Sequence, residues 1–323
     1  MFCIDSFRHK GQYTRLNEAS ELDGWHERVK VFYHNLAVPI DPQLENLLLE
    51  RRIDDSGNVV EKPFDYIVNM ASNSAVERST TDPTECLRNN FELSLTMLEF
   101  ARKNTPKKFV QVSTDEVFGE CLGEKGHDEW DILVPGNPYA ASKAAQDMMC
   151  LAYWRTYNLP IIVTHCMNVI GERQDPEKFL PKIVQYVATN QEIGIYGDSP
   201  DDIGSRVYLH AHNKADAIRF VLEDLPVTLY QQDASGIRRP DKYNICGEDE
   251  FNNLELAELV ADIMDKPLKY KLIPSQSARP GYDRRYALDG DKLRSLGWKP
   301  PLSFKASLEK IVQWTLDNPH WLL

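Results

Sequence analysis

Residues 109–116 read Phe-Val-Gln-Val-Ser-Thr-Asp-Glu, a nearly continuous apolar run that ends in two adjacent carboxylates. Three further runs, at residues 29–35, 64–70 and 161–168, are also apolar nearly throughout. Continuous apolar runs are typical of strands in a parallel sheet that helices cover on both faces. We therefore expect these four runs to form parallel strands.

Helical periodicity appears between the strands, at residues 83–103 and 138–157, and each stretch has a proline near its expected first turn. Strands that alternate with helices predict a doubly wound, Rossmann-like α/β sheet. In such folds, ligands bind beyond the carboxyl ends of the strands, so polar residues at these ends are candidates for a site.

The pattern changes from about residue 172, which predicts a smaller second lobe. Shorter strands are expected at 193–196, 206–210 and 269–273, and helices near 176–190, 253–264 and 304–317. We expect residues 1–171 to form a Rossmann-like domain and residues 172–323 to form a substrate-binding lobe, with an approximate boundary and some interleaving.

Composition excludes several classes of protein. The 323 residues carry a formal net charge of −12, which argues against nucleic-acid binding, since that requires a basic face. No apolar run is long enough to span a membrane, and no basic-then-apolar leader opens the chain. The six cysteines are scattered without paired spacing, so we expect free thiols in a reducing cytoplasm.

Adjacent carboxylates at Asp115 and Glu116 follow a buried strand, where they are costly unless they face a polar cleft. A solvated turn is an equally good interpretation of these two residues taken alone. His210 and His212 have the spacing of one strand face, but there is no third ligand nearby, and we expect no metal site.

Tyr139 and Lys143 are four residues apart at the start of a predicted helix, which places them on one helical face. A lysine ammonium there would stabilise a tyrosinate, so the phenol could act as a base near neutral pH. A chain of this length yields roughly one such pair by chance. The position of the pair, at a helix start after the strand that ends at Thr114, makes a functional role the stronger interpretation.

Further polar groups are spread along the second lobe. They comprise Asn168 in Asn-Val-Ile-Gly171, Glu177 and Lys178, Arg206, and the Arg-Pro-Gly-Tyr-Asp-Arg-Arg run at 279–285. Arginines can clamp phosphate oxygens in pairs, so the set suits a diphosphate substrate. For any single arginine, an ordinary surface position is the better interpretation.

Taken together, these motifs resemble the extended short-chain dehydrogenase/reductases, and among them the dTDP-glucose 4,6-dehydratases. The resemblance covers nearly the whole chain, in STDEVFG (113–119), NPYAASK (137–143), PEK (176–178), YNICG (243–247), RPGYDRRYALD (279–289) and LGWKP (296–300). Its most specific part is Thr114-Asp115-Glu116, since related epimerases and decarboxylases share the Tyr/Lys pair but usually have small residues in place of the acids.

The resemblance implies a hydro-lyase with bound NAD that converts a nucleotide-diphosphate glucose to its 4-keto-6-deoxy form. Tyr139 would take the proton of the sugar 4-hydroxyl, with Thr114 nearby and Lys143 tuning the tyrosine. Glu116 would then remove the C5 proton while Asp115 protonates the departing 6-hydroxyl.

The same resemblance implies a set of binding residues and a homodimer. The cofactor would contact Asp5, Asn35, Leu36, Met70, Ala71, Ser72, Asn90, Tyr139 and Lys143. The nucleotide sugar would contact Ser74, Asn168, Glu177, Lys178, Arg206, Asn244, Arg279 and Tyr282. The dimer would form through the helices at 83–103 and 138–157.

The chain departs from the family at its start. The family opens with a strand and a glycine-rich turn that cradles the cofactor pyrophosphate on a helix N-terminus. Here the glycines before residue 100 are Gly11, Gly24 and Gly57, and Met1-Phe-Cys-Ile-Asp5 resembles the family's second strand. Judged against the family, we expect about 30 residues, one strand–turn–helix unit, to be absent. We expect a truncated or misassigned start rather than a natural relative that binds no cofactor.

Smaller departures affect the binding residues. Asn73 and Ala75 replace the Glu and His common in the turn after the fourth strand, and Asn35-Leu36 replaces Asp-Ile. Two alternative functions stay open: an epimerase or decarboxylase that uses Tyr139 and Lys143 without elimination, and, because the glycine-rich turn is absent, an inactive nucleotide-sugar binder or fragment. The sequence leaves the nucleotide, the sugar and the pathway open, with dTDP-glucose the leading substrate.

Overall fold

A computed structural model describes residues 1–8, 11–21, 24–50, 52–53, 56–60, 64–231, 238–274 and 283–322. The chain forms two compact units, each built from three segments. Unit 1 comprises Met1–Ser113, Asn137–Val163 and Pro226–Asp241, and unit 2 comprises Thr114–Gly136, Thr164–Leu225 and Lys242–Leu323. Each helix of the described ranges is too short or too polar to traverse a lipid bilayer.

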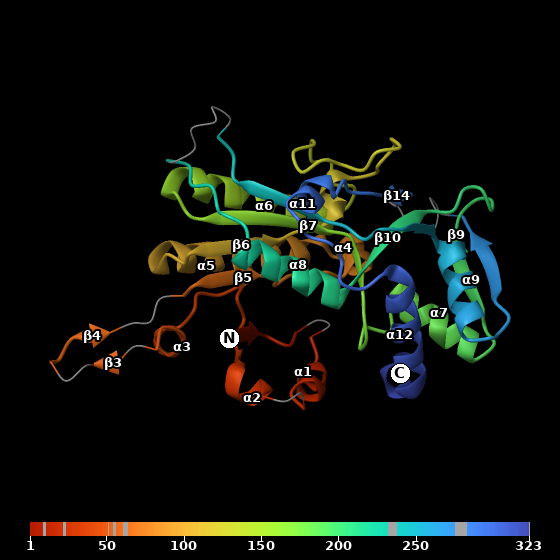
Figure 1. Ribbon diagram of the computed structural model, residues 1–323, viewed down its shortest axis with the longest axis horizontal. Coiled ribbons are helices and arrows are strands. Elements are labelled where there is room, and N and C mark those ends of the chain that lie inside the picture. The colour runs from red at the N-terminus through yellow and green to blue at the C-terminus, as the bar shows by residue number, and fades with distance from the viewer. Residues whose placement is uncertain are drawn as a thin grey trace. The chain divides into compact units, whose positions relative to one another are not determined.

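Unit 1 contains most of the strands and helices expected in the first half of the chain (Figure 1). Its helices are α1 (Tyr13–Ala19), α2 (Trp25–Arg28), α3 (Pro42–Leu48), α4 (Val76–Thr81), α5 (Pro83–Asn104) and α6 (Pro138–Tyr157). Its strands are β1 (Phe2–Asp5), β2 (Lys30–Tyr33), β3 (Arg52–Ile53), β4 (Val59–Val60), β5 (Tyr66–Asn69) and β6 (Lys108–Val112). The strands β7 (Ile161–Cys166) and β11 (Asp241–Ile245) begin in this unit.

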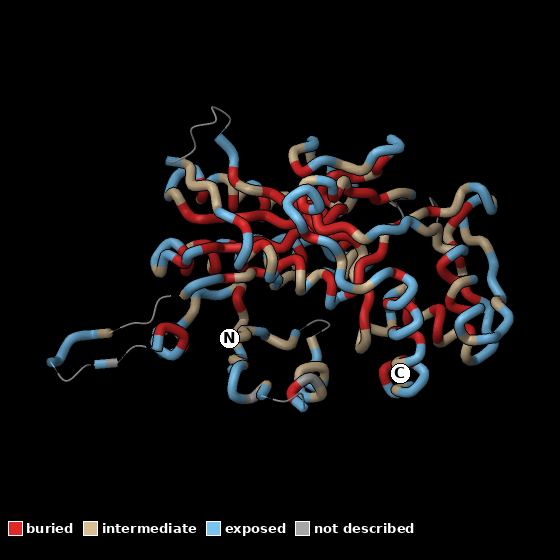
Figure 2. Tube along the Cα trace, viewed as in Figure 1, coloured by how far each residue is buried: buried red, intermediate tan, exposed pale blue. Residues whose placement is uncertain are grey.

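The larger sheet has the strand order β11-β7-β6-β5, and β5 pairs with β6 in parallel. Each residue of β6 and β7 is buried, as the continuous apolar runs predicted (Figure 2). Among the described residues, β1 pairs with β2 alone, in parallel, and the two strands form a separate small sheet. The predicted α/β fold with parallel strands is confirmed.

Apolar residues of α5 and α6 build the core of unit 1. Leu98 and Ala101 of α5 are fully buried, and Trp154 of α6 is 1% exposed. The small β1–β2 sheet is tied to the same core because Phe2, Ile4 and Phe32 pack against it. Hydrophobic burial of this extent is the main source of stability for the unit.

Unit 2 combines short strands with helices that share a second core. Its helical segments are η1 (Asp115–Phe118), α7 (Phe179–Ala188), α8 (Ala211–Glu223), α9 (Asn253–Ile263), α11 (Asp291–Ser295), α12 (Phe304–Asp317) and η2 (Pro319–Leu322). Its strands are β8 (Asn168–Ile170), β9 (Glu192–Tyr196), β10 (Ser205–His210), β12 (Glu250–Asn252), β13 (Lys269–Ile273) and β14 (Arg285–Tyr286). Helices α7, α9 and α12 pack together around residues such as Ile183, Val260 and Ile311 (Figure 1).

The predicted elements of the second half are confirmed to within a few residues, but the local structure around two histidines differs. His210 is the last residue of β10 and His212 lies in α8, so they do not share a strand face. His210 is the N-cap of α8, where its Nδ1 accepts a hydrogen bond from the backbone N–H of His212 at 2.9 Å. The chain changes from strand to helix between the two residues, and their spacing in the sequence does not reveal this change.

The start of α6 matters for the site because Tyr139 is its second residue. Asn137 is the N-cap, with its Oδ1 accepting a hydrogen bond from the backbone N–H of Ala140 at 2.9 Å, and Pro138 is the first helical residue. Both features are favourable at a helix N-terminus, since the cap pairs an otherwise unsatisfied donor and proline needs none.

Replacing this cap should weaken α6 by a predictable amount. We expect Asn137→Ala to lower the free energy of unfolding by about 1 kcal/mol, because the N–H of Ala140 loses its acceptor. Asn137→Asp retains an acceptor and should remain near the native stability in chemical denaturation. Equal losses in the two variants would show that the cap contributes nothing.

Candidate functional site

In unit 1, α6 carries the predicted Tyr139 and Lys143, one helical turn apart on the same face. Both side chains are buried, with 9% of Tyr139 and 2% of Lys143 exposed. The ammonium of Lys143 donates hydrogen bonds to Oε1 of Gln146 at 2.6 Å and to the carbonyl oxygen of Val112 at 2.7 Å. The lysine is therefore held as a buried, hydrogen-bonded cation at the end of β6.

The fully buried Asn90 of α5 ties the start of α6 to the loop that follows β5. Its Oδ1 accepts a hydrogen bond from the backbone N–H of Asn73 at 2.7 Å, and its Nδ2 donates to the hydroxyl of Ser142 at 2.8 Å. The Ser142 hydroxyl donates to the carbonyl oxygen of Tyr139 at 2.7 Å. Asn90 thus brings two predicted parts of the cofactor site together within one unit.

The loop after β5 contains the predicted Met70, Ala71 and Ser72. Met70 is 54% exposed, whereas the Ser72 hydroxyl is buried and has no hydrogen-bond partner in the described part of the chain. A buried hydroxyl without a partner is costly, so this oxygen is suited to pair with a bound ligand.

The strand ends nearer the N-terminus carry the other predicted cofactor residues. Asp5 ends β1, and its Oδ1 accepts a hydrogen bond from the backbone N–H of Phe7 at 2.7 Å. Oδ1 of Asn35 accepts from the N–H of Ala37 at 3.1 Å, and Leu36 is buried in the core. The contact of these residues with the adenosine part of the cofactor stays a prediction from the resemblance. The sequence before residue 100 has no glycine-rich turn for the pyrophosphate.

In unit 2, the acidic pair lies in the short helix η1, with Thr114 as its N-cap. The Thr114 hydroxyl donates to Oδ1 of Asp115 at 2.9 Å, and the same oxygen accepts from the backbone N–H of Glu116 at 3.0 Å. Asp115 is 3% exposed and Glu116 is partly exposed. The two neighbouring carboxyl groups therefore have different environments.

Burial and, after it, the negative charge of Glu116 raise the pKa of Asp115 to about 7. The hydrogen bond from Thr114 and the positive charge of Arg206 act in the opposite direction. Oδ2 of Asp115 is buried and has no hydrogen-bond partner among the described residues. A carboxyl group in this state can hold a proton near neutral pH and donate it to a substrate.

Arg206, in β10, is 8% exposed and is held by backbone carbonyls. Its guanidinium donates to the carbonyl oxygens of Ser205 and Arg284 at 2.6 Å and of Asp283 at 2.7 Å, and it lies over the Tyr286 ring at 4.4 Å. The arginine thereby fixes the segment that follows the predicted Arg279 and Tyr282, which themselves lie outside the described residues.

The remaining predicted substrate residues are dispersed over short segments. Asn168 begins β8 and pairs in register with Tyr208 of β10. Glu177 and the α7 N-cap Lys178 are exposed, and so is Ser74 of unit 1. Within the described ranges, no group of three or more His, Cys, Asp or Glu side chains could hold a metal ion.

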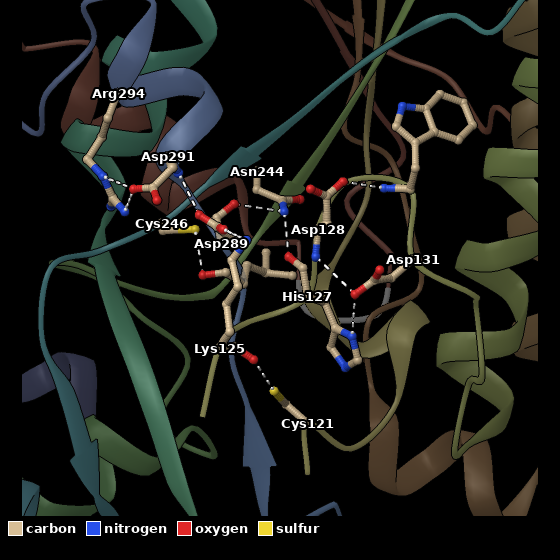
Figure 3. A network of polar contacts seen from close by, with 12 residues as sticks. Cys121, Lys125, His127, Asp128, Asp131, Asn244, Cys246, Asp289, Asp291 and Arg294 are labelled. Atoms are coloured by element: carbon tan, nitrogen blue, oxygen red, sulfur yellow. Dashed lines mark hydrogen bonds and ion pairs between the residues drawn. The ribbon is translucent and has the colours of Figure 1, made fainter. Parts of the chain in front are cut away.

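Asn244 is fully buried and belongs to a polar network in unit 2 (Figure 3). Its Nδ2 donates to the carbonyl oxygens of His127 at 2.9 Å and Asp289 at 3.0 Å, and its backbone N–H donates to Glu129 at 3.1 Å. Asn244 thus joins β11 to the segment around His127 and to the segment before α11. Its Oδ1 is buried and has no hydrogen-bond partner among the described residues, so that oxygen can still accept a bond from a ligand.

Sequence reasoning missed two buried glutamines beside Lys143. Gln111 lies inside β6 and Gln146 lies three residues after Lys143 on α6, and both are fully buried. The signal was present, since an amide within an apolar strand and another on the buried face of a helix each need a hydrogen-bond partner.

Comparison with known proteins reveals close relatives. The model of the family described as GDP-mannose 4,6 dehydratase matches residues 47–311. A dTDP-glucose 4,6-dehydratase of Streptomyces niveus is 35% identical over 258 residues, covering 80% of this chain and 71% of that protein. One of Xanthomonas campestris is 32% identical over 311 residues, covering 89% and 84%. The crystal structure of dTDP-glucose 4,6-dehydratase from Bacillus anthracis in complex with NAD matches at a TM-score of 0.78 and 27% identity, covering 99% of this chain and 89% of that one. The resemblance inferred from residues 113–119 and 137–143 is confirmed.

The raised pKa of Asp115 makes a prediction about stability. Because the folded-state pKa is about 7 and lies above the unfolded value, the contribution of this group to stability is lost as the pH rises from about 4 through 7. We expect the free energy of unfolding of Asp115→Asn, relative to that of the native protein, to increase by roughly 3 kcal/mol between pH 5 and pH 8. Chemical denaturation at the two pH values measures this difference.

The exposed Asp249 provides the matched control, since Asp249→Asn removes an equal charge at the surface. A stability difference between Asp115→Asn and the native protein that stays constant from pH 5 to pH 8 would contradict the raised pKa.

Proposed function

The chain belongs to the GDP-mannose 4,6 dehydratase family of extended short-chain dehydrogenase/reductases, and from that membership we propose that it is an NAD-dependent nucleotide-sugar 4,6-dehydratase. The proposed substrate is a nucleotide-diphosphate glucose, with dTDP-glucose first among them because the relatives from Streptomyces niveus and Xanthomonas campestris are dTDP-glucose 4,6-dehydratases. The reaction removes water and leaves a 4-keto-6-deoxy sugar. The proposed location is the cytoplasm.

The observation that carries this proposal is the unequal pair of carboxyl groups at Asp115 and Glu116. Elimination of water needs an acid for the leaving hydroxyl and a base for the proton at the neighbouring carbon. Asp115, with its pKa near 7, is suited to be the acid. Glu116 is more exposed and is suited to be the base. Neighbouring carboxyl groups whose environments separate their pKa values are a recognised arrangement for such paired roles.

The first step is oxidation at C4 of the sugar. Tyr139 takes the proton from the 4-hydroxyl, and the nearby ammonium of Lys143 favours the tyrosinate that this step requires. When bound, NAD would accept the hydride from C4 and return it to C6, and the proton held by Glu116 would return to C5. The residues proposed to hold NAD are Asp5, Asn35, Leu36, the loop at 70–72, Asn90, Tyr139 and Lys143.

Elimination follows because the 4-keto group acidifies the proton at C5. Glu116 takes that proton as the C5–C6 double bond forms, while Asp115 donates its proton to the 6-hydroxyl oxygen, which leaves as water. Thr114 orients Asp115 through its hydrogen bond to Oδ1. The nucleotide, diphosphate and sugar are proposed to contact Ser74, Asn168, Glu177, Lys178, Arg206, Asn244, Arg279 and Tyr282.

We also propose that the protein is a homodimer joined through α5 and α6. On α5, Leu87, Phe91 and Leu95 recur every four residues and are 39%, 46% and 39% exposed. On the adjoining α6, Met148 is 45% exposed. A helical stripe of exposed apolar side chains is favourable when a second copy covers it.

The dehydratase is tested by product mass after incubation with NAD and, in turn, dTDP-, UDP-, GDP- and CDP-glucose. We expect a product lighter by one water from at least one of them. Glu116→Gln should lower the rate of formation of this product by at least about a hundredfold, because a general base contributes that much or more to the rate. Tyr139→Phe should lower this rate too, since oxidation at C4 precedes elimination.

The alternative functions give different results in the same assay. An epimerase would leave the mass unchanged, and Glu116→Gln would keep most of its activity. The exposed Glu248→Gln is the matched control for loss of a carboxylate, and it should retain the native rate. A water-loss product that survives Glu116→Gln would refute the role given to this residue.

The dimer is tested by light scattering after size-exclusion chromatography. We expect the native chain to elute with twice the monomer mass, and Phe91→Glu to elute as a monomer because it buries a charge in the interface. Leu122 is 88% exposed outside this stripe, so Leu122→Glu should leave the mass unchanged. A native monomer, or a dimeric Phe91→Glu, would overturn the proposed interface.

A further inference from the structure

We infer that Gln146 is a positioning residue, which fixes the position of the Lys143 ammonium and helps to determine its electrostatic environment. This inference rests on the proposed role of Tyr139 and Lys143. The Gln146 side chain is fully buried and lies at the centre of a chain of amides that runs through three structural elements. None of these amides takes part in the chemistry proposed above.

The hydrogen bonds determine the orientation of the Gln146 amide. Its Oε1 accepts from Lys143 Nζ at 2.6 Å and from Gln111 Nε2 at 3.1 Å, and its Nε2 donates to the carbonyl oxygen of Asn90 at 2.7 Å. Rotating the amide by half a turn would set its NH2 group against an ammonium and another NH2 group. All three hydrogen bonds would be lost, so a single orientation is compatible with the surroundings.

Gln111 is oriented in the same way by the next residue in the network. Its Oε1 accepts a hydrogen bond from Nδ2 of Asn69 at 2.9 Å. The side chains of Asn69 on β5, Gln111 on β6 and Gln146 on α6 therefore form a relay that ends on the Lys143 ammonium. Each member is at most 2% exposed, so water does not compete for these hydrogen bonds.

Two fixed acceptors hold the Lys143 ammonium in place. Gln146 Oε1 and the carbonyl oxygen of Val112 accept hydrogen bonds from Nζ at 2.6 and 2.7 Å. These two hydrogen bonds place Nζ between the end of β6 and the buried face of α6.

The other titratable groups around Lys143 come from α6 and the elements packed on it. Tyr139 and the buried Asp147 lie one turn before and after it on α6. From α5, the thiol of Cys86 lies near the Asn90 amide at 3.7 Å. The Arg78–Glu85 pair joins α4 to α5 at the surface, and β5 and β6 contribute the amides of the relay. Gln146 is thus a neutral side chain that accepts a hydrogen bond directly from Nζ.

Two substitutions change what Gln146 offers to the ammonium in opposite directions. Gln146→Glu keeps the shape and adds a negative charge, so it should raise the pKa of Lys143 by more than one unit. The added negative charge partly cancels the effect of the Lys143 ammonium on Tyr139, so the pKa of the Tyr139 phenol should rise. The acidic limb of the dehydratase pH profile should therefore move to higher pH by about one unit. Gln146→Met removes the acceptor, so it should lower the pKa of Lys143 and move the alkaline limb to lower pH.

The pKa of Lys143 is measured directly by NMR of full-length protein labelled with 13C at lysine Cε, with the resonance assigned from its absence in Lys143→Arg. This readout does not require turnover. It therefore tests the inference even if native protein dehydrates no nucleotide sugar, a result that would count against the proposed function instead. Gln191→Glu, at an exposed position between α7 and β9, is the control for added charge.

Shifts in opposite directions in the two Gln146 variants, with none in Gln191→Glu, would support the positioning role. An unchanged Lys143 pKa in both variants would overturn it. A uniform loss of activity with both limbs of the pH profile unmoved would also overturn it, because that pattern indicates a purely structural amide.

Discussion

A buried ammonium needs hydrogen-bond acceptors, and much of the polar structure of unit 1 follows from that requirement. Lys143 is 2% exposed, and the desolvation of an unpaired charge there would cost more than the fold could tolerate. A backbone carbonyl at the end of β6 and the amide of Gln146 supply the acceptors. That amide requires partners in turn, which explains why Gln111 and Asn69 interrupt otherwise apolar strands.

The two units treat their buried ionisable groups in opposite ways. In unit 1, the Lys143 amino group donates hydrogen bonds to two buried acceptors, Gln146 Oε1 and the carbonyl oxygen of Val112. In unit 2, Asp115 has Thr114 and one backbone N–H as donors to Oδ1 but none in the described residues to Oδ2, so burial favours its protonated form. The amino group of Lys143 thus has acceptors within hydrogen-bonding distance, whereas the carboxyl group of Asp115 lacks a donor to Oδ2 among the described residues and has a raised pKa.

Much of the fold could be predicted from the sequence because hydrophobic periodicity is a local signal. The predicted helices at 138–157 and 304–317 match α6 and α12 residue for residue. The start of α8 at Ala211 was missed, because two histidines two residues apart have the same spacing in a strand and across a helix N-cap. Tyr139, Lys143 and the acidic pair could be recognised from short motifs. Gln146 could not, because its role depends on residues 77 and 35 positions earlier, at Asn69 and Gln111, and only the folded chain brings them within hydrogen-bonding distance.

The three-segment construction of unit 1 has a consequence for the order in which the protein can fold during synthesis. Residues Pro226–Asp241 complete this unit, and the indole N–H of Trp154 finds its acceptor there, at the carbonyl oxygen of Thr228, 2.7 Å away. Domains usually fold from the N-terminus as they leave the ribosome. Here the first unit must wait with part of its core open until residue 241 has emerged, while two segments of unit 2 are already outside. Translation speed and chaperone contact over this interval therefore bear on the yield of native protein.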